Sequence, residues 1–175
     1  MTKKKAVIVI AVALVLCTVA VFAAACTEEM TPQEALAVLS GSSTGVAVAD
    51  VTVTVTDSSN YVIYSYPEKA DVPAEIQGVI SSFVPDMNGT SSFDYNTANF
   101  TGLDLTAQEE TASLTGEITN LNAFLGTENL MYSGGTLTAS IDTVNMRPLS
   151  VDISYTYSGS VNNFAIVINT VYNYQ

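Results

Sequence analysis

The sequence predicts an α+β domain, in which a curved antiparallel sheet of six or seven strands carries two or three helices on one face. Three observations lead to this prediction. Apolar and polar residues alternate with a period of two through most of 136–174, which is typical of half-buried strands. Short connections join these strands, which favours an antiparallel meander. Apolar residues recur at helical spacing in 32–40 and 73–84, and such helices can cover the apolar sheet face.

The N-terminal segment is typical of an export signal. Three lysines at 3–5 precede an almost unbroken apolar run from Ala6 to Cys26, and small residues end this run. The run of about 20 residues is also long enough to span a bilayer as a helix. Under either interpretation the lysines stay in the cytoplasm, and the rest of the chain is extracytoplasmic.

The stretch VFAAACTEEM, residues 21–30, leaves three fates open. Ala23 and Ala25 match the small-x-small pattern of ordinary signal cleavage, the helix could stay uncut, or Cys26 could be acylated. We favour acylation, because A-A-A-C resembles a bacterial lipobox in which Ala23 replaces the usual leucine. The domain prediction is therefore a signal peptide at 1–25, a lipid-anchored tether at 26–30 with Cys26 as the attachment site, and one domain at 31–175.

The part of the chain after residue 25 is strongly acidic. It contains all 17 acidic residues and only two basic ones, Lys69 and Arg147. Such a surface repels phosphates, which argues against nucleic acid as a partner. It also repels anionic lipid heads, so we expect the anchor to hold the domain at the membrane. No cysteine follows Cys26, so the exported domain relies on its core for stability.

The first half of the domain contains one clear helix and one hairpin. Thr31 and Glu34 stand in the capping-box relation, so TPQEALAVLSG predicts a helix over 32–40. The stretch VTVTVT at 51–56 predicts a strand, and the preceding valines fall in the opposite phase, which predicts a bulge near 49–50. The DSSN sequence that follows predicts a turn, and a returning strand at 61–66 completes the hairpin.

The middle of the chain is less regular. The apolar spacing in 73–84 predicts a second helix, and the polar stretch 86–106 predicts a loop with at most one irregular strand. In 106–126 the leucines and isoleucine have helical spacing, but Thr, Ser and Gly are poor helix formers. We favour a strand at 111–119 and a short helix at 120–126.

The C-terminal third predicts three strands, at 136–142, 149–157 and 163–174. Their polar face carries Ser, Thr, Asp and Asn, as expected for a surface in contact with solvent. Their apolar face carries Leu137, Ala139, Ile141, Leu149, Val151, Ile153, Tyr155, Tyr157, Phe164, Ile166, Ile168, Tyr172 and Tyr174.

The residue content argues against catalysis and metal binding. The chain has no histidine, which removes the commonest general base and metal ligand, and no serine lies in G-x-S-x-G or S-x-x-K. Asp86–Asp94 is rich in oxygen ligands, but its glycine stands at the fourth position of the loop and an EF-hand needs it at the sixth. Many strand tyrosines suggest a ligand platform, but cross-strand packing is the commoner role. We therefore predict no catalytic residue, no metal site and no cofactor.

The segment TLTASIDTVNMRPLSVDISYTYSG, residues 136–159, resembles LolA/LppX-like bacterial lipoproteins. In that family a strand ends in an acidic residue, a short Thr/Asn turn follows, and a Pro–hydrophobic pair starts the next strand. The matching positions here are Asp142, Thr143, Asn145, Pro148 and Leu149. The preceding LTGEITNLNAFLG is similar to a family strand and short helix, so the resemblance covers roughly 110–175.

The resemblance implies an unclosed half-barrel around helices, with an apolar cavity for acyl chains. It transfers no functional residue, because the matched positions are turn and strand formers. The expected function is that of a non-enzymatic lipoprotein of the bacterial cell envelope, lipid-anchored at the extracytoplasmic face of a membrane and binding a lipid or other apolar molecule between sheet and helices. The alternative is an adhesion or protein-interaction module that uses an acidic sheet face.

Overall fold

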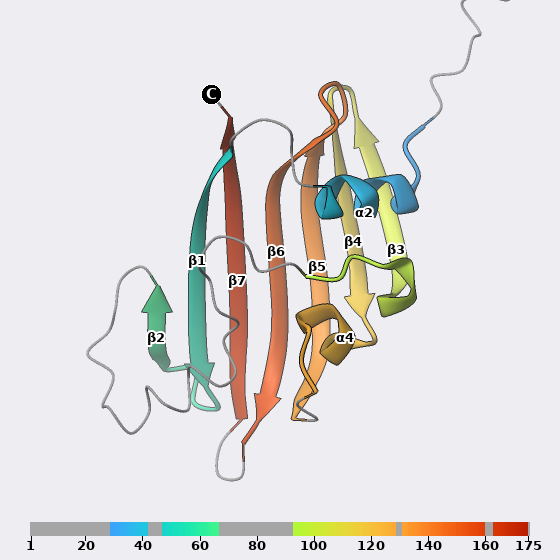
Figure 1. The fold of residues 1–175 in the computed structure, drawn as a ribbon. Helices are drawn as coiled ribbons and strands as arrows, with labels where there is room; N and C mark the ends of the chain where they lie inside the picture. The colour runs from blue at the N-terminus through green and yellow to red at the C-terminus, as the bar shows by residue number, and fades with distance from the viewer. Residues whose placement is uncertain (1–28, 42–46, 67–92, 129–130, 160–162, 175) are drawn as a thin grey trace, which may run out of the picture.

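A computed structural model describes residues 29–41, 47–66, 93–128, 131–159 and 163–174. Seven described strands form one antiparallel sheet in the order β2-β1-β7-β6-β5-β4-β3 (Figure 1). Two short helices, α2 (Pro32–Ser40) and α4 (Leu121–Leu125), pack against one face of it. The remaining elements are β1 (Ala47–Asp57), β2 (Val62–Tyr66), η1 (Thr97–Asn99), β3 (Phe100–Gln108), β4 (Thr111–Ile118), β5 (Tyr132–Asp142), β6 (Arg147–Ser158) and β7 (Asn163–Tyr174).

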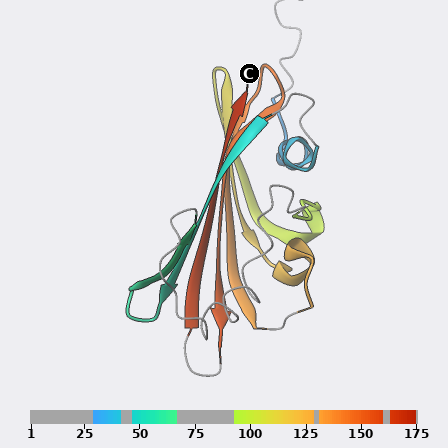
Figure 2. The same ribbon diagram turned by 60° about the vertical axis from the view of Figure 1, so that its left-hand side comes forward.

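The sheet is twisted and open, and it is neither closed nor strongly curled (Figures 1 and 2). The described residues therefore do not form the expected half-barrel, and the fold is mostly β, with two short helices packed against the sheet. The edge strands β2 and β3 lie at opposite sides of the sheet, with five strands between them. The right-handed twist that strands adopt accumulates across the sheet without bringing these edges together.

The order of the strands combines a meander with one long-range pairing. β3 to β7 follow one another as antiparallel neighbours, as the short connections predicted. β1 then pairs with β7 in unbroken register from Ala47 opposite Tyr174 to Asp57 opposite Phe164. The predicted bulge near 49–50 is therefore wrong, because the alternation on β1 continues through these residues. A register shift does occur further along, at Val55/Thr56 opposite β2.

The core lies between the sheet and the two helices. Val53, Ile168, Ile153 and Leu137 are cross-strand neighbours on four successive strands, and each is at most 1% exposed. From the helical layer, Phe124 is fully buried in the same core. Each such side chain contributes about 1.5–3 kcal/mol on burial. Side chains of the described residues thus occupy the space beneath the helices, where the sequence had suggested a lipid cavity.

Most local predictions are confirmed. The helix over 32–40 carries its capping box, and the strand and short helix expected within 111–126 are β4 and α4. The irregular strand allowed in 86–106 is β3, whose register shifts between Thr101 and Asp104. The three C-terminal strands are β5, β6 and β7. The predicted helix over 73–84 lies outside the described residues.

Candidate functional site

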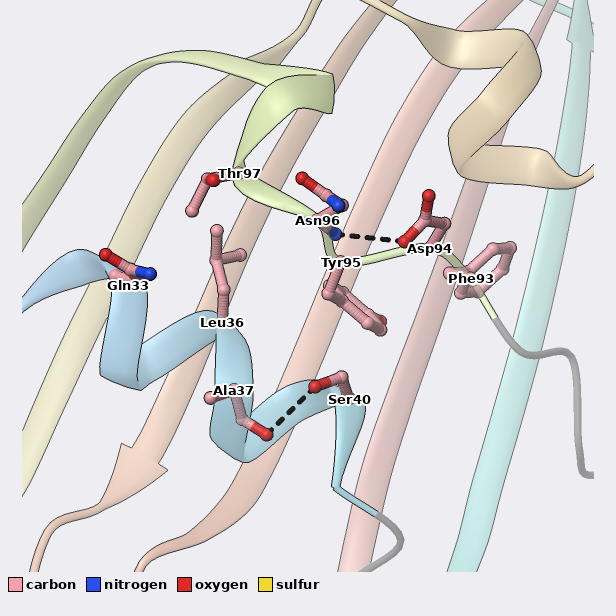
Figure 3. A pocket seen from close by; sticks show the side chains of 9 residues that line it. All are labelled: Gln33, Leu36, Ala37, Ser40, Phe93, Asp94, Tyr95, Asn96 and Thr97. Carbon is pink, nitrogen blue, oxygen red and sulfur yellow. Dashed lines mark hydrogen bonds between the residues drawn. The ribbon is translucent and has the colours of Figure 1, made fainter.

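A cleft of about 410 Å³ lies between α2 and the segment 93–97 (Figure 3). This segment crosses over the sheet toward η1, so the cleft sits on the helical side of the molecule (Figure 1). Its two walls come from parts of the chain that are far apart in sequence. The lining residues are Gln33, Leu36, Ala37, Ser40, Phe93, Asp94, Tyr95, Asn96 and Thr97.

The α2 wall is fixed at its N-terminus and along its buried side. The Thr31 N–H donates to Glu34 Oε2 at 2.8 Å, and the Glu34 N–H donates to Thr31 Oγ1 at 3.3 Å. The bond from the Thr31 backbone holds the pKa of Glu34 below its usual value, so a negative charge stays at the positive end of the helix. Leu36, only 1% exposed, ties the helix to the core and forms the base of the cleft.

The opposite wall is held by a buried asparagine. Asn99 is 3% exposed, and its Nδ2 donates to the carbonyl of Asp94 at 2.9 Å and to Asp94 Oδ2 at 3.0 Å. The Asn99 carbonyl accepts from the Thr119 N–H at 2.8 Å, which links the segment to the end of β4. The Asp94 N–H donates to the Phe124 carbonyl at 2.9 Å. Because a buried polar group left without partners costs about 1–3 kcal/mol, these bonds fix the wall in place.

Four aromatic rings support the same wall. Phe93 stacks on Phe124 with ring centroids 5.0 Å apart, and Tyr95 meets Phe124 edge-on at 5.5 Å. Phe100 contacts Phe124 edge-on at 5.6 Å. Burial, and to a smaller extent the nearby Tyr172, raises the pKa of Tyr95. The Tyr95 hydroxyl therefore stays neutral at physiological pH.

The cleft combines an apolar base with a polar rim. The apolar and aromatic lining residues are Leu36, Ala37, Phe93 and Tyr95. The polar groups around it are the amides of Gln33 and Asn96, the hydroxyls of Ser40 and Thr97 and the carboxylate of Asp94 (Figure 3). Five of the nine lining residues are polar, so the cleft is more polar than the predominantly apolar lining that is usual for small-molecule sites. The arrangement suits an amphipathic ligand that is neutral or cationic, because the one charged lining group is a carboxylate.

The described carboxylates offer no evident metal site. In these parts of the chain, no three His, Cys, Asp or Glu side chains come close enough to hold an ion together. Asp94, the last residue of the oxygen-rich loop, uses Oδ1 to accept from the Asn96 N–H at 3.1 Å and Oδ2 to accept from Asn99. Residues 86–92 of that loop lie outside the described residues.

Of the described residues that the sequence singled out, Asp94 lines the cleft and the strand tyrosines do not. Cys26 and the apolar run before it lie outside the described residues, and none of the described helices is long and apolar enough to cross a membrane. Of the strand tyrosines, Tyr155 is 2% exposed and contacts Tyr132 edge-on at 5.5 Å, which agrees with packing. Tyr61 is 71% exposed at the far end of β1 and β2.

Sequence reasoning missed the aromatic wall. Phe93 and Tyr95 were noted only as scattered rings in an irregular loop, because they belong to no periodic pattern. The available signal was the D-x-N motif at 94–96, in which Asp94 Oδ1 accepts from the Asn96 N–H. It overlaps an aromatic alternation, because Phe93 and Tyr95 flank Asp94.

Comparison with known proteins finds no matching family model, no matching curated protein and no matching solved structure for this chain.

Proposed function

We propose that this chain is a lipoprotein of the bacterial cell envelope, anchored at the extracytoplasmic face of a membrane through Cys26, that binds one small amphipathic molecule in the cleft between α2 and segment 93–97. The proposal needs no enzymatic step. Its strongest support is the cleft itself, in which two rigid walls frame an apolar base and an uncharged polar rim around Asp94.

The size and position of the cleft narrow the ligand class. A volume of about 410 Å³ lies within the range of about 300–1,000 Å³ that is common for small-molecule sites. The described side chains between the sheet and the two helices are buried against one another, so we place the proposed site in the surface cleft. A neutral or cationic lipid head group with the first carbons of its chain, or a free amphipathic molecule, has the required chemistry.

Cleft binding is tested with a bulky substitution and a matched control. Ala37→Trp places an indole in the cleft, whereas Ala107→Trp places one on the exposed edge strand β3. We expect Ala37→Trp to lower binding of the neutral fluorophore N-phenylnaphthylamine at least about fivefold relative to Ala107→Trp, because indole fills much of the site. Mass spectrometry of the full chain purified from a bacterial host identifies a co-purifying ligand. Equal fluorophore binding by both variants would refute the cleft as the site.

The anchor is tested separately. Cys26→Ser removes the acylation site, and we expect the variant to move from the membrane fraction to the soluble fraction. A variant that remains in the membrane would instead favour the uncleaved helix.

A second candidate function rests on the outer face of the sheet. Alternation with the buried strand residues places Asp50, Asp104, Glu117 and Asp152 on that face, among rows of Ser and Thr. We propose as the alternative an adhesion or interaction module that binds a cationic partner there. Binding to a lysine-rich peptide should then weaken as salt rises and in the double variant Asp104→Asn/Glu117→Gln. Binding that is unchanged both at higher salt and in the double variant would exclude this alternative.

A further inference from the structure

The turn between β5 and β6 is rigid and carries exposed apolar side chains. Val144 is 68% exposed and Met146 is 52% exposed. Asp142 holds the turn, since its Oδ1 accepts from the Val144 N–H at 3.1 Å and from the Asn145 N–H at 2.9 Å. Its Oδ2 accepts from Asn145 Nδ2 at 2.7 Å and from Arg147 Nε at 3.1 Å. A turn fixed by its own hydrogen bonds thus presents two large apolar groups to solvent.

The residue at position 146 is unfavourable for the turn itself. Met146 has φ of 51°, in the left-handed region where glycine and asparagine are the usual residues. Met146 is still 52% exposed, so it gains only partial burial in the described structure and retains the cost of its conformation. Backbone outliers of this kind are a reason to look for a function at the site.

The position of the turn indicates what could cover it. The β5–β6 turn lies at the same end of the sheet as Glu29 to Thr31, the residues that lead into α2 (Figures 1 and 2). Five residues separate Cys26 from Pro32, and a fully extended chain of that length spans at most about 20 Å. A lipid on Cys26 therefore holds this end of the domain close to the membrane surface.

We propose that the β5–β6 turn inserts Val144 and Met146 into the lipid–water interface of the membrane that holds Cys26. The inference rests on the anchoring through Cys26 proposed above, and it adds a second contact that sets the orientation of the domain. Interfacial apolar groups reach about 5–10 Å into the head-group region. Arg147 already pairs with Asp142, and the Thr143 N–H bonds to the carbonyl of Glu110 in the neighbouring acidic turn. The preferred lipid is therefore zwitterionic rather than anionic.

The absence of tryptophan from the sequence makes a direct test available. Val144→Trp places one indole at the turn, and Tyr61→Trp places one at an equally exposed site at the opposite end of the sheet. Each full-length acylated protein is reconstituted into phosphatidylcholine vesicles that contain brominated lipid. Because bromine quenches only nearby indole, we expect emission at position 144 to fall at least about twofold and emission at position 61 to stay unchanged.

The controls separate this inference from the anchor. Vesicle flotation reports anchoring, and a protein that floats without quenching at position 144 overturns the membrane contact alone. A protein that does not float overturns the anchor and, with it, this inference. Shielding of position 144 in native membranes but not in lipid vesicles would identify a protein partner and also overturn the proposal. Adding Met146→Ser to Val144→Trp should reduce the quenching.

Discussion

The β1–β2 turn and the β5–β6 turn lie at opposite ends of the sheet and share one design (Figure 1). Each starts with an aspartate whose Oδ1 accepts two backbone N–H bonds, at 2.8 and 2.9 Å for Asp57 and at 3.1 and 2.9 Å for Asp142. Each contains one non-glycine residue with positive φ, Asn60 at 61° and Met146 at 51°. The backbone geometry of such a turn therefore does not dictate which residue occupies it.

The two turns differ in the residues that they expose. The first has Ser-Ser-Asn at its tip, followed by Tyr61, which is 71% exposed, and its asparagine tolerates the left-handed conformation. The second has Val144 and Met146, although a polar residue or glycine would suit both the solvent and the backbone better. Large apolar groups are exposed at both turns, so the feature that sets the second turn apart is a methionine, rather than an asparagine, in the left-handed conformation. The substitutions below test what the residues of each turn contribute.

The largest expected effect on stability comes from removing the Asp142 clamp, by which we mean the hydrogen bonds that the Asp142 carboxylate accepts within the β5–β6 turn. Asp142→Ala removes hydrogen bonds to two backbone N–H groups and to the side chains of Asn145 and Arg147. Asp57→Ala removes two backbone bonds and should cost about 1 kcal/mol. We expect the urea midpoint to fall further for Asp142→Ala than for Asp57→Ala. Equal shifts would mean that the side-chain bonds of Asp142 contribute nothing.

The sequence predicted a turn that begins at Asp142, but it did not predict the backbone conformation of Met146 or the exposure of Val144. Asp142, Asn145 and Pro148 are turn formers, and alternation predicted the end of β5 at 142 but placed the start of β6 at 149, whereas β6 begins at Arg147. The positive φ of Met146 had no signal, because the stretch VNMR contains no glycine. The exposure of Val144 depends on how the turn sits at the end of the sheet, which no local pattern encodes.

The cleft and the sheet edges likewise depend on long-range contacts that a local sequence pattern does not predict. The cleft wall depends on Asn99, whose partner Thr119 lies 20 residues away. The open sheet depends on β1 pairing with β7 rather than on any strand period. Strands 136–174 were predictable because their core face is periodic, whereas tertiary contacts position Phe93 and Tyr95 and decide whether the edges meet.

The second-largest effect on stability is expected from acid, which weakens the Asp142 clamp by protonating its carboxylate. Hydrogen bonds from Asn145, its side chain first, hold the pKa of Asp142 below the ordinary value of 3.8, and Arg147 adds a smaller effect. The ionised form therefore stabilises the fold fully above the unfolded pKa, and this stabilisation is lost as pH falls through the folded pKa. We expect the urea midpoint of the wild type to exceed that of Asp142→Asn near neutral pH and to converge on it below about pH 4. A constant difference across this range would contradict the assignment.

Exchanging the two positive-φ residues should move stability in opposite directions. Met146→Asn should stabilise the domain, and Asn60→Met should destabilise it, each by about 0.5–1 kcal/mol, because asparagine fits the left-handed region better than methionine. Urea unfolding of both variants measures this directly. If Met146→Asn is destabilising, the methionine makes a stabilising contact in the folded chain, and the argument from backbone strain fails.

The smallest expected change in stability is also the most informative about function. Val144→Ser removes an exposed isopropyl group at the tip, and an exposed substitution of this kind usually changes stability by no more than about 0.5 kcal/mol. If the tip contacts lipid, phosphatidylcholine vesicles should nevertheless protect this turn from proteolysis less in Val144→Ser than in the wild type. The β1–β2 turn should be cleaved equally in both proteins. The matched change Tyr61→Ser at that far turn should alter protection at neither end. Unfolding and vesicle proteolysis, measured on the same preparations, separate a turn that serves the fold from one that serves a membrane contact. A loss of stability without a change in vesicle protection would assign Val144 to the fold.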